Sequence, residues 1–300
     1  MKSAERTGLL FALAGFAMIS IGDAIVKSMT GMWPGPAMAA LRYLVGTVGL
    51  GAILLHCEGL RGFGFPGFRW QVLRGFGVAM SAMAFFTALQ LMPIAEATSI
   101  SFTSPMITGL LAMVLLGEPA RRSTWIASAV AFAGVLIVLR PNFAVIGPAA
   151  LLPLVSATGM ALLMIGNRAV AGRASALSMQ FNVAVLGLVF MALFTLAGHF
   201  SGIPRLHVGW PQASVVLRCS IIACSASVAH ALIYLATTRA GAATIAPMTY
   251  VQLLMAGLFG WFLFAERPDA MALMGATIIV GAGLYLWRAG RMTDEPQGTD

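Results

Sequence analysis

The chain is built from apolar blocks of about 20 residues, separated by short polar or Gly- and Pro-rich connections. At about 1.5 Å of rise per residue, one such block crosses the roughly 30 Å hydrocarbon layer of a bilayer as a helix. Charged residues make up 9% of the sequence, whereas a soluble domain has roughly 25%. The blocks lack the alternation at every second residue that a transmembrane barrel requires. The sequence therefore predicts an all-α membrane protein.

Ten spans are expected. Their predicted limits are Gly8 to Ser28, Gly35 to Leu55, Trp70 to Leu91, Ala95 to Leu116, Thr124 to Leu139, Gly147 to Gly166, Ala176 to Gly198, Ala213 to Thr237, Ala240 to Ala265 and Asp269 to Trp287. The first block follows Lys2 and Arg6, as in a signal peptide, but it continues to about Ser28 without a small-x-small cleavage site. We therefore expect it to be retained as the first helix.

Two stretches, residues 92–119 and 239–268, follow one plan. The matched positions are Ala97-Thr98 with Ala243-Thr244, Pro105 with Pro247, and Glu118-Pro119 with Glu266-Arg267-Pro268. Such a repeat indicates duplication. Each half then has five spans, an odd number, so the second half enters the membrane upside down. We predict two inverted five-helix repeats, residues 1–144 and 145–290, around a central cavity, followed by a disordered cytoplasmic tail, residues 291–300.

The distribution of Lys and Arg predicts the orientation. With ten spans and the N-terminus inside, these residues are concentrated in the inner loops and termini, as the positive-inside rule requires. We therefore expect a multi-pass protein of a bacterial-type plasma (inner) membrane with both termini cytoplasmic. The net charge of +8 then faces the anionic lipids of the inner leaflet. Basic and aromatic residues are not interleaved on a polar face, so nucleic acid is not an expected partner.

The repeated Ala-Thr…(Gly/Ala)-Glu-x-Pro pattern resembles the drug/metabolite transporter superfamily, in its EamA-type branch of ten-helix exporters. The first-span pattern from Asp23 to Lys27, followed by Pro36 and Leu41-Arg42-Tyr43, is also typical of that branch. The resemblance implies a basket of helices whose central cavity opens alternately to the two sides. It makes export of small metabolites the expected function, with amino acids, aromatic ones included, as the first choice. The expected partners are this small-molecule substrate and the lipid bilayer.

Two other functions remain open. The same fold would serve a metabolite importer for S-adenosylmethionine or a vitamin-like substrate, because the sequence does not fix the direction of transport. An intramembrane enzyme is a remote alternative, since Ser20-Ile21-Gly22-Asp23 is similar to a motif of intramembrane aspartyl proteases. A protease of that type needs a second aspartate within the membrane. The only other candidate, Asp269, begins the tenth span at the outer surface, so we expect no enzyme.

Four ionisable residues gather in the outer third of the predicted bundle: Asp23, Lys27, Arg42 and Glu96. An ionisable side chain inside a span costs about 2.5–3.5 kcal/mol on insertion scales, so each is a functional candidate. One interpretation is a structural set of ion pairs at helix ends, with Lys27 reaching toward the interface. The other is an outer gate that docks the ammonium and carboxylate of a zwitterion. Asn167 follows Gly166 as Asp23 follows Gly22, and we expect it to mark the inner gate.

The eighth span carries a polar stripe, Ser227, His230 and Tyr234, at helical spacing. In lipid such a stripe would be unsatisfied, so we expect it to face the interior. There these side chains would either bind substrate or bond a neighbouring carbonyl. His230 is the one group near the midplane that titrates close to neutral pH, which makes it the candidate for proton coupling.

Further candidates for substrate binding lie on the fourth and ninth spans: Ser99, Thr103, Thr244 and Tyr250. Pro105 and Pro247 should kink these spans and free carbonyls there, and paired helix breaks are typical of transport sites. The alternative for each hydroxyl is ordinary helix packing. Glu266, and Glu118 in the first half, are expected to cap or tether helix ends rather than to contact substrate.

An adaptable apolar surface for the substrate is the last predicted part of the site. Its candidates are Met83, Phe85, Met160 and Met164, because thioethers fit varied side chains. Core packing or lipid contact is the alternative for each.

No cofactor or metal is expected. The sequence has no nucleotide-binding loop and no His-Glu-x-x-His pattern. Its three cysteines, Cys57, Cys219 and Cys224, lack Cys-x-x-Cys spacing. We expect a monomer.

Overall fold

The computed structural model describes residues 3–117, 122–240 and 246–294, and every regular element in these ranges is helical. The first part contains α1 (Ser3–Lys27), α2 (Gly35–Glu58), η1 (Gly59–Phe63), α3 (Phe68–Leu91), α4 (Ile94–Ser101) and α5 (Ser104–Leu116). The second contains α6 (Arg122–Ile146), η2 (Gly147–Leu151), α7 (Leu152–Ala169), α8 (Ala176–His199), η3 (Pro204–Leu206) and α9 (Ala213–Ala240). The third contains η4 (Ala246–Tyr250), α11 (Val251–Phe264) and α12 (Ala270–Asp294).

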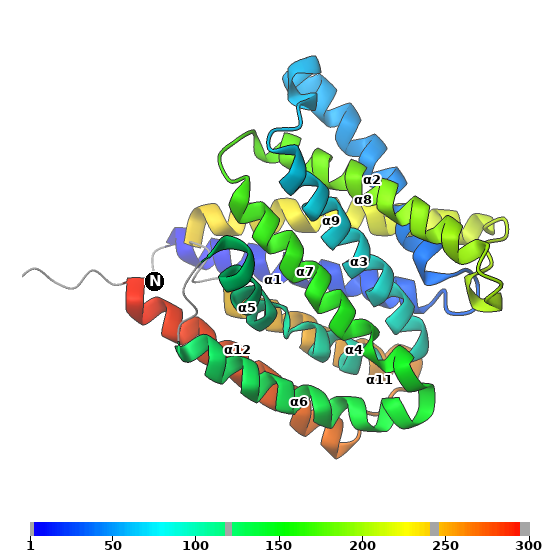
Figure 1. Ribbon diagram of the computed structural model, residues 1–300, viewed down its shortest axis with the longest axis vertical. Helices are drawn as coiled ribbons and strands as arrows, with labels where there is room; N and C mark the ends of the chain where they lie inside the picture. The colour runs from blue at the N-terminus through cyan, green and yellow to red at the C-terminus, as the bar shows by residue number, and fades with distance from the viewer. Residues whose placement is uncertain (1–2, 118–121, 241–245, 295–300) are drawn as a thin grey trace, which may run out of the picture.

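These helices confirm the all-α membrane fold. Within the described residues, nine helical segments are long and apolar enough to cross a bilayer, and a shorter apolar one runs over Met248–Phe264. The shorter segment is the ninth predicted span, and it follows residues 241–245, which lie outside the described part. Successive spans run in alternate directions (Figure 1). The start of α1 and the end of α12 therefore lie at the same end of the bundle, named here the terminal end. The opposite end is named the distal end.

Several helices differ in length from their predicted spans. The fifth span was expected to end at Leu139, but α6 continues past Pro141 to Ile146. The predicted tail from residue 291 also begins as helix, because α12 extends to Asp294. The fourth span is divided, as its proline suggested: α4 ends at Ser101, and α5 begins at Ser104 with Pro105 at its second residue. A proline is tolerated in the first turn of a helix, where its missing N–H would have no partner.

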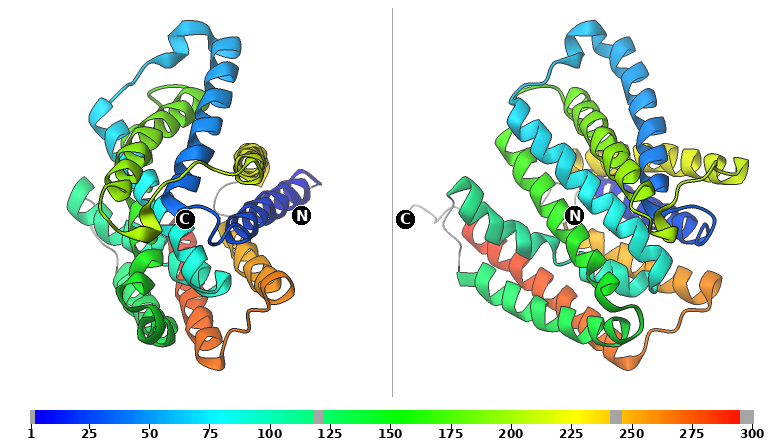
Figure 2. Two further views of the ribbon diagram at one scale, coloured as in Figure 1. Left: turned by 90° about the vertical axis from the view of Figure 1, so that its right-hand side faces the viewer. Right: turned by 45° about the vertical axis from the view of Figure 1, so that its right-hand side comes forward.

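The packing of the helices reflects the inverted repeat. Two pairs pack most extensively, α1 against α9 and α3 against α7, and each pair joins a helix of the first half to one of the second. In the two halves α1 corresponds to α7, and α3 corresponds to α9. Inversion therefore converts the pair α1–α9 into the pair α7–α3. It maps the pairs α2–α8 and α6–α12, which also pack closely, onto themselves. Figures 1 and 2 show α6 and α12 side by side along one edge of the molecule.

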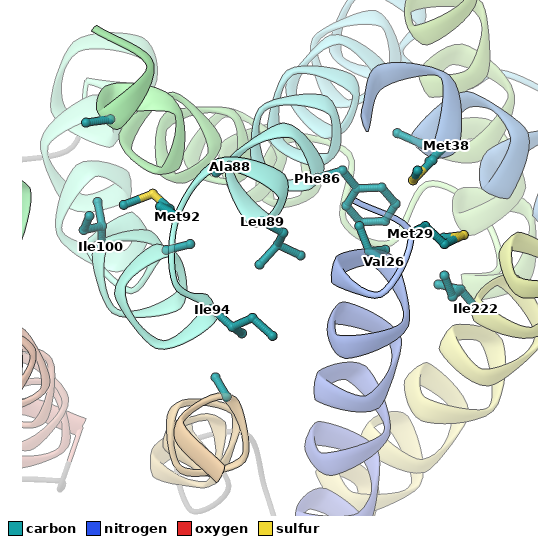
Figure 3. Packing of buried hydrophobic residues seen from close by; sticks show 14 of the residues in the cluster. Val26, Met29, Met38, Phe86, Ala88, Leu89, Met92, Ile94, Ile100 and Ile222 are labelled. Atoms are coloured by element: carbon teal, nitrogen blue, oxygen red, sulfur yellow. The ribbon is translucent and has the colours of Figure 1, made fainter. Parts of the chain in front are cut away.

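The main apolar core lies toward the distal end. Phe86 of α3 packs with Val26 of α1, Met29 in the turn after α1, Met38 of α2 and Ile222 of α9 (Figure 3). Met29 and Met38 are fully buried. Val26 and Phe86 lie near the ends of α1 and α3, Met29 lies in the turn after α1, and Met38 lies in the first turn of α2. Apolar packing therefore closes the distal end around the polar groups described next.

Candidate functional site

An ion pair between Lys27 and Glu266 joins four segments at the distal end. Lys27 ends α1, and Glu266 lies in the connection from α11 to α12. The second carboxylate oxygen of Glu266 accepts a hydrogen bond of 2.9 Å from the Ile94 amide, the first residue of α4. Lys27 also donates to the carbonyl of Met92, just after α3. Glu266 thus caps a helix and tethers a connection, as the sequence predicted, whereas its counterpart Glu118 lies outside the described residues.

Asp23 lies one turn deeper than Lys27 on α1, and it does not pair with Lys27. Its side chain is half-buried, and the charge of Arg42 on α2 acts on it. Arg42 is also half-buried, and its guanidinium lies 5.5 Å from the centre of the Phe86 ring and 5.7 Å from that of Tyr43. Asp23 and Arg42 are close enough to interact electrostatically, yet they form no ion pair within the described structure.

His230 lies deeper than Asp23 on the neighbouring helix α9. Gly22 packs near Ile222, and Gly15 packs against Ala229 and Ile233. His230 of α9 therefore lies beside Gly15, about two turns of α1 further from the distal end than Asp23. His230 is also within the electrostatic reach of Arg42.

The polar stripe of α9 forms hydrogen bonds within its own helix. The side chains of Ser227 and His230 are exposed. The Ser227 hydroxyl donates to the carbonyl of Ala223 at 3.0 Å, and Nδ1 of His230 lies 2.6 Å from that of Ala226. Each side chain thus bonds a carbonyl of its own helix four residues earlier, which is the alternative to substrate binding given in the sequence analysis. The side chain of Tyr234 lies outside the described part.

The two broken spans meet near their breaks. Phe102, between α4 and α5, packs edge-to-face on Tyr250, the last residue of η4, with ring centres 5.4 Å apart. The matched breaks predicted from Pro105 and Pro247 therefore lie together, although Thr244 falls in the undescribed residues 241–245.

The hydroxyls near the first break mostly serve α4 itself. Ser99 donates to the Glu96 carbonyl at 2.9 Å and Thr103 to that of Ile100 at 2.7 Å, and both are buried. Thr98 differs from them, because its hydroxyl is buried without a hydrogen-bond partner in the described residues. The Glu96 side chain is also buried, at 8% exposed, in the first turn of α4. These groups support the packing interpretation for Ser99 and Thr103 more than direct substrate contact.

The four residues proposed as an adaptable apolar surface are divided between different environments. Met83 and Phe85 of α3 are partly buried against the main core. Met160 of α7 is half-buried, and Met164, one turn further, is 42% exposed. Met83 and Phe85 therefore belong to the packing that closes the distal end, whereas Met164 lies at the surface.

A buried polar network lies toward the terminal end. Nε of Arg74 donates a 2.6 Å hydrogen bond to Oδ1 of Asn167, and a second nitrogen of the guanidinium donates to Gln71. Gln71 is fully buried and Arg74 is 5% exposed. The sequence analysis placed Asn167 at the inner gate but did not include Arg74 among the candidate site residues. The spacing of Gln71 and Arg74, three residues apart at the start of a span, is the signal that could have revealed the pair.

Comparison with known proteins gives concordant matches. Residues 6–140 match the EamA-like transporter family. An uncharacterized transporter of Helicobacter pylori is 30% identical over 230 residues, 74% of each chain. An S-adenosylmethionine uptake transporter of Rickettsia bellii is 29% identical over 218 residues, 72% of this chain and 71% of the relative. A riboflavin transporter of Rhizobium johnstonii is 27% identical over 287 residues, 93% of this chain and 90% of the relative.

A solved structure described as "Crystal structure of protein" shares the fold. Its TM-score is 0.57 at 20% identity, over 97% of this chain and 99% of the solved one. At this identity the likeness concerns the fold alone.

Proposed function

Because this chain belongs to the EamA-like transporter family, we propose that it is a secondary transporter for the uptake of a zwitterionic metabolite of the S-adenosylmethionine type. Membership of the family makes it a membrane transporter and not an enzyme, which removes the intramembrane protease from consideration. The observation that carries the proposed substrate is the similarity to S-adenosylmethionine uptake transporters over 72% of the chain. Uptake was the alternative in the sequence analysis, where export of amino acids was the first choice.

Amino-acid export remains the second candidate because the two substrates share one chemical group. S-adenosylmethionine carries the same ammonium and carboxylate as a free amino acid. Asp23 and Arg42 supply the complementary charges for either substrate. The relatives named for uptake favour the inward direction over the outward one. Riboflavin, named for other relatives, has neither charge, and the two ionisable side chains would have no matching group on it.

The proposed mechanism is alternating access between the inverted halves, residues 1–144 and 145–290. The Lys27–Glu266 pair would act as the outer gate, while Arg74 and Asn167 would stabilise the inner end. The contact between Phe102 and Tyr250 lies where the two broken spans meet, the place where transporters of this construction bind substrate. His230 and Ser227 on α9, and Glu96 on α4, are the candidates to extend the pathway. The proposal includes a monomer in the plasma (inner) membrane with both termini cytoplasmic.

Transport can be tested with the purified protein in liposomes without ATP. We expect liposomes preloaded with S-adenosylmethionine to accumulate the labelled compound by exchange, and excess methionine to compete with it. Protein-free liposomes are the control. Riboflavin exchange without S-adenosylmethionine exchange would overturn the proposed substrate. Exchange of amino acids alone would favour the second candidate.

A further inference from the structure

Asp23 and Asn167 occupy equivalent positions in the two inverted halves. Each follows a glycine, Gly22 on α1 and Gly166 on α7, at which the helix lies against its main partner. Gly22 lies against Ile222 of α9, and Gly166 lies against Arg74 of α3. The spacing from Gly15 to Gly22 also recurs exactly between Gly159 and Gly166. The surroundings of the two polar residues can therefore be compared position by position.

The partner helix supplies a cation at one of these positions and none at the other. Next to Asn167, the partner helix contributes Arg74, whose guanidinium donates to the amide oxygen at 2.6 Å. At the equivalent place beside Asp23, the partner helix contributes the apolar Ile222. Asp23 has an acidic side chain, yet within the described residues that side chain has neither a hydrogen bond nor an ion pair. A carboxylate inside a membrane span is costly unless a positive group pairs with it.

Arg42 likewise lacks a hydrogen-bond partner within the described residues. Its guanidinium lies against the rings of Phe86 and Tyr43, which hold it by their faces and accept no ordinary hydrogen bond. No hydrogen-bond acceptor contacts Arg42 in the part of the chain that the structure describes. A guanidinium oriented in this way presents a planar fork of N–H groups, which matches the two oxygens of a carboxylate.

We propose that Asp23 and Arg42 together bind the head group of an α-amino acid, with Asp23 receiving the ammonium and Arg42 the carboxylate. Both residues are half-buried and lie at similar depth, because Asp23 is about one turn from the end of α1 and Arg42 about two turns from the start of α2. Arg42 lies over the Phe86 ring, and Phe86 packs with Val26, which is one turn from Asp23 on α1. The two residues therefore lie near the same apolar contact without forming an ion pair in the described structure. Lys27 does not compete for this place, since it is occupied by Glu266 and the Met92 carbonyl.

This inference rests on the proposed function and assigns to each charge of the substrate one residue. It predicts that each substitution removes recognition of one charge only. The test measures inhibition of S-adenosylmethionine exchange in liposomes by three compounds. These are methionine, its analogue without the ammonium, 4-(methylthio)butanoate, and its analogue without the carboxylate, 3-(methylthio)propylamine.

The wild-type protein should prefer methionine to both analogues. Asp23→Asn should lose the preference over the deaminated acid, and Arg42→Gln the preference over the amine, each by a factor on the order of 10 to 100. Asp23→Glu should restore part of the preference for the ammonium. The matched controls are Asp269→Asn, where the aspartate only caps α12, and Arg205→Gln in the exposed distal connection. Both controls should leave the order of the three inhibitors unchanged.

The outcomes separate the failure of this inference from failure of the proposed function. If the wild-type protein exchanges no S-adenosylmethionine, the proposed substrate fails. If the wild type exchanges it and the two variants weaken all three compounds equally, the head-group assignment is wrong. If Asp23→Asn retains exchange and inhibitor order but loses uptake driven by a proton gradient, Asp23 carries a proton instead of the ammonium. Direct binding of labelled S-adenosylmethionine to detergent-purified variants keeps the test valid for a variant that reconstitutes poorly.

Discussion

Two glycines determine how closely α3 and α7 approach each other. A Cβ atom at Gly159 would lie 2.6 Å from the carbonyl oxygen of Gly77, and one at Gly77 would lie 2.7 Å from the carbonyl of Gly159. Real Cβ atoms do not approach backbone atoms so closely, and small residues at such contacts let membrane helices pack backbone to backbone. Next to this contact, the hydroxyls of Ser81 and Ser156 lie 3.1 Å apart and are buried.

We therefore predict that Gly159→Ala destabilises the protein by about 1–3 kcal/mol, the usual cost of overpacking a tight contact. The measurement is the apparent Tm of the detergent-purified protein. Gly46→Ala in α2 is the matched control, because a Cβ there meets nothing within 4 Å. A helical alanine should be neutral or slightly stabilising at that position. An equal Tm for the two variants would contradict the contact.

At the scale of single residues, the sequence shows which positions of the two halves correspond, but it does not show which side chains become partners. The recurrence of Gly-Asp and Gly-Asn could be recognised because equivalent positions of a repeat share local sequence. The partner of Lys27 could not, since Asp23 is its neighbour along α1 whereas Glu266 is brought to it only by the fold. The exposure of His230 was also beyond prediction, because the rotation of α9 depends on the helices that it packs against.

At the scale of secondary structure, many polar contacts of this protein lie at helix breaks and helix ends. The spans with Pro105 and Pro247 were predicted to break. The first is divided between α4 and α5, where Phe102 contacts Tyr250, the last residue of η4. The sequence indicates a break because proline cannot donate an intrahelical hydrogen bond. It does not indicate the exact limits, since α6 continues through Pro141 where the prediction had it end.

The connection between α11 and α12 should stabilise the distal end rather than contact substrate. We predict that Glu266→Gln lowers the apparent Tm while leaving the Kd for substrate unchanged, because glutamine can still accept from the Ile94 amide but cannot pair with Lys27. The side chains of the pair are 12% and 14% exposed. The loss of one partner from such a poorly solvated pair costs about 1–3 kcal/mol.

The neighbouring Asp269→Asn is the control for Glu266→Gln. Asp269 accepts from the Ala272 amide at 2.6 Å, and asparagine is an equally good cap. Its Tm should therefore match that of the wild type. A change in Kd for Glu266→Gln at constant Tm would mean that this carboxylate belongs to the substrate site.

For the whole molecule, the positive-inside bias and the arrangement of helix ends make the same prediction. The start of α1 and the end of α12 share the terminal end (Figure 1), and the basic loops of the sequence connect helices there. The sequence could predict this topology because it follows from counting apolar blocks and charges. It could not predict which helices of the two halves pair, since that depends on contacts such as those of Gly15 and Gly159.

Labelling of one cysteine tests the orientation. Cys57 is exposed near the terminal end of α2, and we expect a membrane-impermeant maleimide to label it in inside-out vesicles but not in intact cells. The experiment uses a chain in which Cys219 and Cys224 are replaced by serine. In the same background with Cys57 also replaced, Ser201→Cys in the exposed distal connection should show the opposite pattern. Labelling of both positions from one side would be incompatible with the topology.

The exchange of helices between the halves, α1 with α9 and α3 with α7, has a consequence for how the chain is made. Ribosomes release α1 into the bilayer long before its neighbour, which begins at Ala213, has been translated. Until then, lipid tails must cover the groove around Gly15 and Gly22 that α9 later fills. Neither half can complete its helix packing when it is first inserted. Assembly is completed only when the last third of the polypeptide enters the membrane.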